Sequence, residues 1–299
     1  MIGPDDVIAE LPQELAVEAA EPALLLQPER VIDLAPLFPP DAKLVGYAMS
    51  DLGQRYVLDA HRGIYELVQG EARLVFSLPD STVAGGEGDG LPPVELTDMA
   101  LAYLSPDSAE PWFVLTAEND GYALAPGSSL LQSYFCYLPP VSEWPSSYAP
   151  SVSQSLRAQG IAVVERTDGV GVNSATGQIF AQPRTFRLDT GELAATELFV
   201  FDASGGQPIN TRLIQNAEFH AGSMLVGSSS LLLGWRDELY RVEAWGGSLQ
   251  RIGRVAGVAS VEGLGWGPEH RLVLLDGPGK RLYEIDHLSY FPPGMDGAL

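Results

Sequence analysis

The chain contains little cysteine and few basic residues. Cys136 is the single cysteine among 299 residues, which excludes an intrachain disulfide. Only 17 Lys and Arg stand against 39 Asp and Glu, giving a net charge of −22. This negative charge argues against non-specific electrostatic binding to nucleic acid or to an anionic membrane. Solubility is one interpretation of the acidity; cation binding, a basic partner or a salty habitat are the alternatives.

Long apolar runs and common catalytic motifs are absent as well. No stretch is as long and apolar as a transmembrane helix, so we expect no membrane insertion. The N-terminal sequence MIGPDDVIAELPQEL has neither the basic nor the apolar part of a signal peptide. We therefore expect a cytoplasmic protein, or a periplasmic or secreted one if a signal was removed. Neither a Gly-x-Ser-x-Gly motif nor a His-Glu-x-x-His motif occurs, which argues against hydrolases of those types.

Glycine and proline, by contrast, are abundant, with 32 and 23 residues. With 45% hydrophobic residues, this composition favours a packed fold of many short strands and turns. Residues 260–286 (SVEGLGWGPEHRLVLLDGPGKRLYEID) predict three short strands, separated by turns at 267–270 and 276–279. This pattern is typical of an antiparallel meander. One meander alone cannot bury its faces, whereas stacked copies can.

The meander pattern recurs along the chain and predicts its organisation. Five repeats are expected, at about residues 43–79, 97–138, 167–214, 218–255 and 258–288. We further expect an acidic N-terminal arm over 1–28, an isolated strand over 29–38, an insertion over 139–166 and a C-terminal tail over 291–299.

The last repeat lacks a fourth strand, and the segment ERVIDLAPLF (29–38) offers one. Propellers commonly protect their sheet edges by completing one terminal blade with the other terminus. The sequence therefore predicts an all-β fold, a single β-propeller with five blades, whose last blade is closed by strand 29–38. Six blades are the alternative, if residues 139–166 contain a degenerate sheet.

The segments SVEGLGWGPEHRLVLLDGPGKRLYEID and TDGVGVNSATGQIFAQ resemble blade units of the SMP-30/gluconolactonase-like propellers and of the SdiA-regulated or phytase-like propellers. The resemblance implies the propeller fold. In the gluconolactonase group it also implies an axial divalent metal held by a Glu of an EGP-type motif, an Asn and an Asp. Here the EG pair is Glu262-Gly263, near the C-terminal end of the chain, and no Asn matches.

The start of each first strand is expected to lie at the mouth of a central channel. The five equivalent positions are Leu44, Asp98, Asp168, His220 and Glu262. Four of the five carry oxygen or imidazole ligands, which predicts a site for a divalent cation (Ca²⁺, Mn²⁺ or Zn²⁺). The alternative is that the acidic side chains accept backbone N–H bonds and cap the blade turns.

The turns between second and third strands are expected to open on the same face and to form a polar rim. The ligand-binding candidates on this rim are Asp59, His61, Glu118, Asn119, Asp120, Arg184 and Arg236. Each of them also fits an ordinary turn residue. Trp144, in the Pro- and Ser-rich insertion, is a further candidate because it can stack on a ligand or partner.

Three functions fit this sequence. The first, which we favour, is a non-catalytic propeller that binds a protein partner or a small polar ligand through this face. The alternative is a metal-dependent hydrolase, similar to a lactonase or an esterase, with an axial site. The third is a carbohydrate-active propeller that uses axial carboxylates.

Overall fold

The computed structural model describes residues 24–77, 95–103, 111–118, 136–138, 163–173, 176–187, 193–201, 210–213, 221–227, 230–243 and 249–286. These residues form β-strands and two short 3-10 turns, so the prediction of an all-β fold is confirmed for them. Within these ranges, no helix is long and apolar enough to span a membrane.

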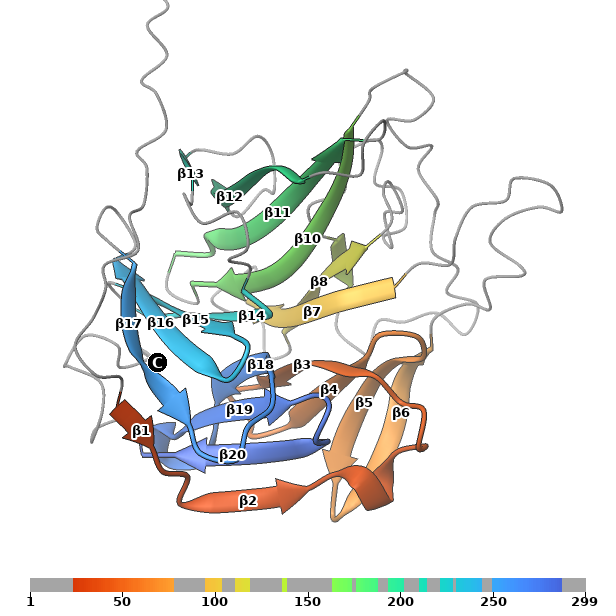
Figure 1. Ribbon diagram of the computed structural model, residues 1–299. Helices are drawn as coiled ribbons and strands as arrows, with labels where there is room; N and C mark the ends of the chain where they lie inside the picture. Colours follow the sequence, from red (N-terminus) through yellow and green to blue (C-terminus); the bar gives the residue numbers. More distant parts are fainter. Residues whose placement is uncertain are drawn as a thin grey trace, which may run out of the picture.

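The strands form five sheets (Figure 1). The first contains β3 (Leu44–Met49), β4 (Arg55–Asp59), β5 (Gly63–Val68) and β6 (Glu71–Ser77). The second contains β7 (Glu95–Ala102), β8 (Trp112–Glu118) and β9 (Cys136–Leu138). The third contains β10 (Val163–Val172), β11 (Ile179–Arg187), β12 (Leu193–Phe201) and β13 (Asn210–Leu213).

The last two sheets each include a strand from the N-terminal part of the chain. The fourth contains β14 (Ser223–Val226), β15 (Ser230–Trp235), β16 (Glu238–Glu243), β17 (Gln250–Val255) and β1 (Leu24–Leu26). The fifth contains β18 (Val261–Trp266), β19 (Leu272–Asp276), β20 (Arg281–Ile285) and β2 (Arg30–Asp33). All described strand pairs are antiparallel except β1 with β17, which is parallel.

The first strand of each sheet lies beside the first strand of the next. β3 contacts β7, β7 contacts β10, β10 contacts β14, β14 contacts β18, and β18 contacts β3. The described hydrophobic core follows the same order, because each buried cluster joins two neighbouring sheets. Leu58 and Ile64 of the first sheet, for example, pack with Met99 and Phe113 of the second. This arrangement of sheets around an axis is that of a β-propeller.

The N-terminal strands differ in part from the prediction. The expected strand 29–38 is found as the shorter β2, which pairs with β20, and a 3-10 turn follows over Ala35–Leu37. Pro36 fits this turn because proline cannot donate to a strand ladder. The sequence analysis missed β1, since residues 24–26 were expected in the arm. Leu24 and Leu25 are exposed, whereas Leu26 is buried between the fourth and fifth sheets.

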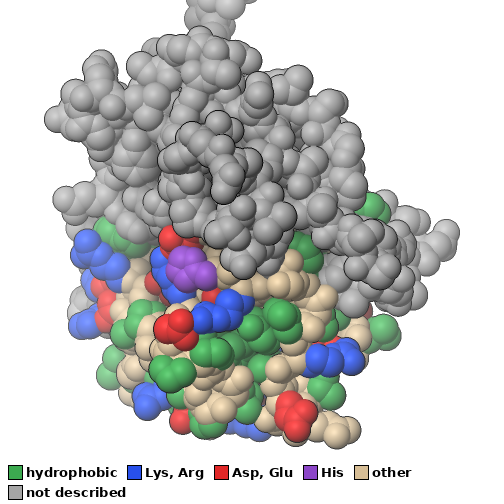
Figure 2. All heavy atoms as spheres, turned by 90° about the vertical axis from the view of Figure 1, so that its right-hand side faces the viewer, with side chains coloured by type: hydrophobic (Ala, Val, Ile, Leu, Met, Phe, Trp, Pro, Cys, Tyr) green, Lys and Arg blue, Asp and Glu red, His purple; other side chains and the backbone are tan. Residues whose placement is uncertain are grey.

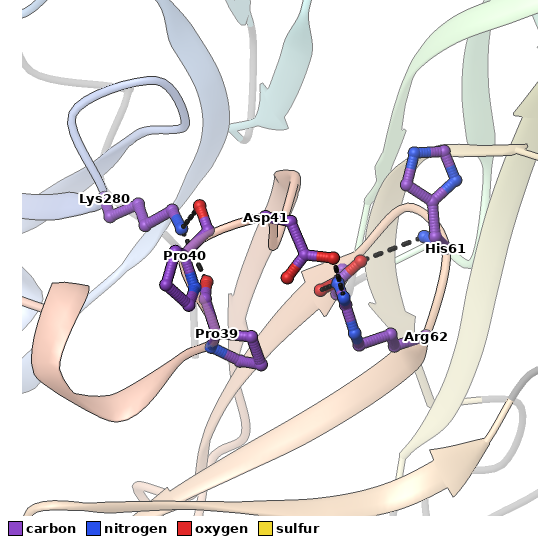
Figure 3. A network of polar contacts seen from close by, with 7 residues as sticks. Pro39, Pro40, Asp41, His61, Arg62 and Lys280 are labelled. Atoms are coloured by element: carbon purple, nitrogen blue, oxygen red, sulfur yellow. Dashed lines mark hydrogen bonds and ion pairs between the residues drawn. The ribbon is translucent and has the colours of Figure 1, made fainter.

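A polar network fixes the crossing from β2 to β3 (Figure 3). The Lys280 Nζ donates to the backbone carbonyls of Pro39 and Pro40, both at 2.7 Å. The Arg62 guanidinium binds Asp41 at 2.6 Å and Asp59 at 3.0 Å. The crossing segment is therefore bonded to a turn of the fifth sheet and to a turn of the first.

One predicted boundary and one predicted strand order are wrong. β10 begins at Val163, so residues 163–166, expected in the insertion, are part of a strand. In the second repeat, the sequence LLQSYFCYL (130–138) predicts the fourth strand; instead, β9 within this segment pairs directly with β8. The sequence YALAP (122–126) predicts the third strand of this repeat, and these residues lie outside the described ranges.

The described part of the chain carries a nearly balanced charge. It holds 16 of the 17 Lys and Arg but only 21 of the 39 Asp and Glu. On the face in Figure 2, basic, acidic and hydrophobic side chains are interspersed. Most of the net negative charge therefore comes from sequence outside the described ranges.

Candidate functional site

Four of the five first strands share a β-bulge near their beginning. In β3 the ladder skips Val45 between Leu44 and Gly46, and in β7 it skips Thr97 between Leu96 and Asp98. The same irregularity spans Asp168 in β10 and Glu262 in β18. A bulge takes its extra residue out of the backbone ladder between the two strands and can re-aim its side chain. The four bulge residues line one cavity.

This cavity, which we call the axial mouth, has a volume of about 210 Å³ and a largely polar lining. Lys43 and Glu95 form an ion pair at its edge. The Ser260 hydroxyl donates to the Glu262 carboxylate at 2.6 Å. The Arg236 guanidinium lies over the Trp235 ring, with 4.8 Å between its central carbon and the ring centroid. The axial mouth therefore presents carboxylates together with a guanidinium.

Below the axial mouth the five inner strands come close together, at a level that we call the waist. A Cβ atom added to Gly263 would lie 2.7 Å from the Tyr47 backbone nitrogen. A Cβ added to Gly169 would lie 2.9 Å from the Ala221 carbonyl oxygen. Real Cβ atoms do not approach backbone so closely, so glycine at these positions permits the tight approach of neighbouring strands.

A buried hydrogen-bond chain joins four inner strands at the waist. Asp98 of β7 accepts the Val170 N–H of β10 at 2.9 Å and the Ser223 hydroxyl of β14 at 3.3 Å. The Ser223 hydroxyl in turn accepts the Leu264 N–H of β18 at 2.9 Å. Asp98 is fully buried, and this burial raises the pKa of its carboxyl well above the usual range. Neither Asp98 nor Ser223 lines the axial mouth.

A second cavity lies on the other side of the waist, at the ends of the same inner strands. Its volume is about 470 Å³. On β3, β7, β10 and β18, residues just before the waist line the axial mouth, and on all five inner strands residues after the waist line this second cavity. In β7, for example, Thr97 lines the mouth, Asp98 is at the waist and Met99 lines the second cavity. We call the second cavity the apolar cavity.

The structure brings together three of the predicted site residues: Asp168, Glu262 and Arg236 line the axial mouth. The register assumed for the first two repeats is wrong, because the mouth-lining equivalents are Val45 and Thr97 instead of Leu44 and Asp98. A bulge shifts the facing of the strand by one residue, and its position is not visible in the repeat pattern.

The other predicted rim residues either bond to neighbouring turn residues or lie outside the residues that the structure describes. Asp59 is buried at the end of β4, where it accepts the His61 backbone N–H at 3.0 Å and pairs with Arg62. The exposed His61 ring points away from the pair of Asp41 and Arg62 (Figure 3). Glu118 ends β8 and Arg184 lies in β11, but their side chains are outside the described residues. So are Asn119, Asp120, Trp144 and His220.

Among the side chains that the structure describes, no group of three or more His, Cys, Asp and Glu residues could hold a metal ion. The predicted ligand Asp98 uses its carboxylate in bonds within the waist. The predicted ligand His220 lies outside the described residues, so the metal site stays a prediction.

Sequence reasoning missed Lys43, Glu95 and the whole apolar cavity. Lys43 directly precedes β3 and Glu95 begins β7. They are equivalent once the two bulges are aligned, but the sequence register that equates Leu44 with Asp98 does not match them. The apolar cavity has no sequence signal, because its lining residues read as ordinary core.

No protein-family model matches the chain, and no similar protein is found among curated proteins. Solved structures are similar only at low identity. A gluconolactonase from Xanthomonas campestris has a TM-score of 0.46 at 11% identity, over 89% of this chain and 99% of that chain. A PQQ-bound aldose sugar dehydrogenase from Streptomyces coelicolor has a TM-score of 0.43 at 13% identity, over 86% of this chain and 98% of that chain. A chain of a mitotic checkpoint complex has a TM-score of 0.40 at 13% identity, over 90% of this chain and 95% of that chain. Likenesses at this level carry no argument about function.

Proposed function

We propose that the five sheets are the five blades of one propeller and that β2 closes its last blade. Two observations support this. β2 supplies the outer strand beside β20, and a buried cluster packs the fifth sheet on the first, with Leu275 and Leu282 against Leu44 and Val57. Closure of this kind removes the edge that would otherwise be open to other chains.

We propose further that the protein binds a small polar ligand in the axial mouth and does not act on it chemically. The observation that carries this proposal is the repeated bulge, which aims Thr97, Asp168 and Glu262 into one cavity. Bulges are over-represented next to functional sites, where they re-aim a side chain. A concave site with a few convergent polar groups is the usual form of a small-molecule pocket.

The lining supports a particular ligand chemistry. Asp168 and Glu262 accept hydrogen bonds, so the ligand must offer hydroxyl or ammonium donors toward them. Arg236 donates, so an acceptor such as a carbonyl or carboxylate fits on its side. The volume of about 210 Å³ restricts the ligand to a small molecule. Polyols, amino acids and sugar acids meet these requirements.

The test is a thermal-shift screen of such compounds, followed by calorimetric titration of each compound that raises the melting temperature. A ligand present at 100 times its Kd stabilises the folded state by about 2.7 kcal/mol. We expect Glu262→Gln and Asp168→Asn to weaken binding, and Glu71→Gln, on the exposed β6, to leave it unchanged. Equal binding by all four proteins would contradict the proposal.

A metal-dependent hydrolase using the same mouth is the second candidate. It is supported by the presence of two oxygen ligands, Asp168 and Glu262, in one cavity. The predicted ligand His220 would be a third. In this function a bound cation would polarise a carbonyl while a carboxylate moves a proton.

Elemental analysis, paired with melting curves with and without chelator, separates the two functions. Stoichiometric metal and a lower melting temperature with chelator would favour the hydrolase. Lactones and simple esters would then be tested as substrates. If the protein contains no metal and its melting temperature does not respond to chelator, the result favours the non-catalytic binding function.

A further inference from the structure

The apolar cavity is built by all five inner strands, and its lining differs sharply from that of the axial mouth. Three of the five methionines of the chain, Met49, Met99 and Met224, line it. Leu101, Leu225 and Leu264 are further lining residues. Methionine side chains are flexible and polarisable, and they occur at surfaces that adapt to ligands of varied shape. The volume of about 470 Å³ lies within the usual range for small-molecule sites.

The rim of the apolar cavity is acidic and contains one strongly exposed leucine. Asp51 and Glu269 are at this rim, and no Lys, Arg or His occurs among the described lining residues. Leu52 is 70% exposed, which makes it the most exposed large hydrophobic side chain in the described part of the chain. Trp266 adds an aromatic ring to the lining.

The turn that carries Leu52 is held in place by hydrogen bonds. The Ser50 N–H donates to the Gln54 carbonyl, and the Gly53 N–H donates to the Ser50 carbonyl, both at 2.8 Å. The Asp51 N–H donates to the Tyr103 hydroxyl of the second sheet at 2.9 Å. Leu52 is therefore held outward at the rim by the turn itself and is not packed on the core.

We propose that the apolar cavity is a second ligand site, for a small hydrophobic molecule that is neutral or positively charged. The methionine- and leucine-rich lining removes the apolar body of such a molecule from water. Trp266 contributes an aromatic side chain to the lining, which suits an aromatic or cationic ligand. Glu269 is paired with Arg271 at 3.4 Å, so the Asp51 carboxylate, without a described basic residue in the lining, is the charge that disfavours an anion. The waist separates this site from the axial mouth.

Two fluorescent dyes with the same aromatic body test this proposal. N-phenylnaphthylamine is neutral, whereas anilinonaphthalene sulfonate carries a negative charge. We expect the neutral dye to bind the full chain with a stoichiometry near one and the sulfonate to bind about tenfold or more weakly, a difference of about 1.4 kcal/mol. Equal affinities, or binding of many dyes per chain, would overturn the proposal.

Surface variants locate the dye without disturbing the fold. Leu52→Ser should weaken binding of the neutral dye several-fold, while Leu74→Ser, an exposed leucine on β6, should not. Asp51→Lys should improve binding of the sulfonate, and Glu71→Lys on β6 should not. Glu262→Gln in the axial mouth should leave both dyes unaffected. If the β6 variants change dye binding as much as the rim variants do, the dye is not in the apolar cavity and the proposal is wrong.

Discussion

At the waist, single residues determine how closely neighbouring blades approach. A Cβ atom added to Gly263 would lie 2.7 Å from the Tyr47 backbone nitrogen and 2.9 Å from the Leu275 Cβ. Neither neighbour can move by side-chain rotation, because one is backbone and the other is the first atom of a buried side chain. The space at this level therefore admits only glycine.

We predict that Gly263→Ala destabilises the protein by about 1–3 kcal/mol, the usual cost of overpacking a core. Urea denaturation followed by circular dichroism measures this loss. Gly70→Asn is the control, since Gly70 has a φ of 84° and no atom within 4 Å of an added Cβ. Asparagine tolerates that backbone conformation, so the control should unfold close to the wild type.

Asp98 gives a prediction about pH. Burial raises its folded-state pKa above the value in the unfolded chain, so the folded state binds the proton more tightly. Stability from this group is therefore fully present below the unfolded pKa and is lost as the pH rises through the raised folded pKa. Asp98→Asn removes this dependence and keeps the shape of the side chain.

We expect the Asp98→Asn variant to gain stability relative to the wild type as the pH increases from about 4 to about 8. Melting temperatures at a series of pH values measure the difference. The Leu74→Ser variant, at an exposed leucine of β6, changes no titratable group and should follow the wild-type profile throughout. Parallel profiles for Asp98→Asn and the wild type would show that Asp98 titrates as an ordinary surface carboxylate.

Among the structural elements, the strands of the first sheet follow the sequence closely. The sequence of the first repeat predicts strands at 44–49, 54–60, 63–68 and 72–78, and these correspond to β3, β4, β5 and β6. They were predictable because short runs of branched and aromatic residues alternate with clear turn signals such as Asp51-Leu52-Gly53.

The elements that sequence reasoning missed depend on distant partners. Residues 24–26 form β1 only because β17 offers a free edge to pair with, and three leucines contain no periodicity. The bulges depend on pairing between the first and second strands, so the repeat pattern could locate Asp168 and Glu262 but could not separate Thr97 from Asp98. The sequence therefore predicted that the candidate site lies at the start of the first strands, but not which residue of each strand lines it.

The N-terminal strands give a prediction that tests whether β2 closes the propeller. Deleting residues 1–38 removes β1 and β2 and exposes the edges of β17 and β20, which can then pair with other chains. We expect this variant to melt at a lower temperature and to self-associate, as measured by calorimetry and light scattering. Deleting residues 1–22 removes no described strand and should change neither property. If the longer deletion stays monomeric with unchanged melting, β2 does not close the propeller.

At the scale of the whole molecule, no blade is independent of its neighbours. Each described core cluster is shared by two consecutive sheets, and the hydrogen-bond chain from Asp98 through Ser223 to Leu264 links the second, third, fourth and fifth sheets. Removing one blade would therefore expose apolar surface on two others. This sharing favours cooperative unfolding of the five sheets.

We predict a single unfolding transition in urea for the full chain. Trp112, Trp235 and Trp266 lie in the second, fourth and fifth sheets, so tryptophan fluorescence reports on blades that are separate in the sequence, whereas far-ultraviolet circular dichroism reports on all strands. Coincident midpoints and slopes from the two probes are the expected result. Asp98→Ala leaves the Val170 N–H and the Ser223 hydroxyl without their buried acceptor, so it should lower the midpoint for both probes together. Separate transitions would mean that the blades unfold one after another and that the shared clusters do not couple them.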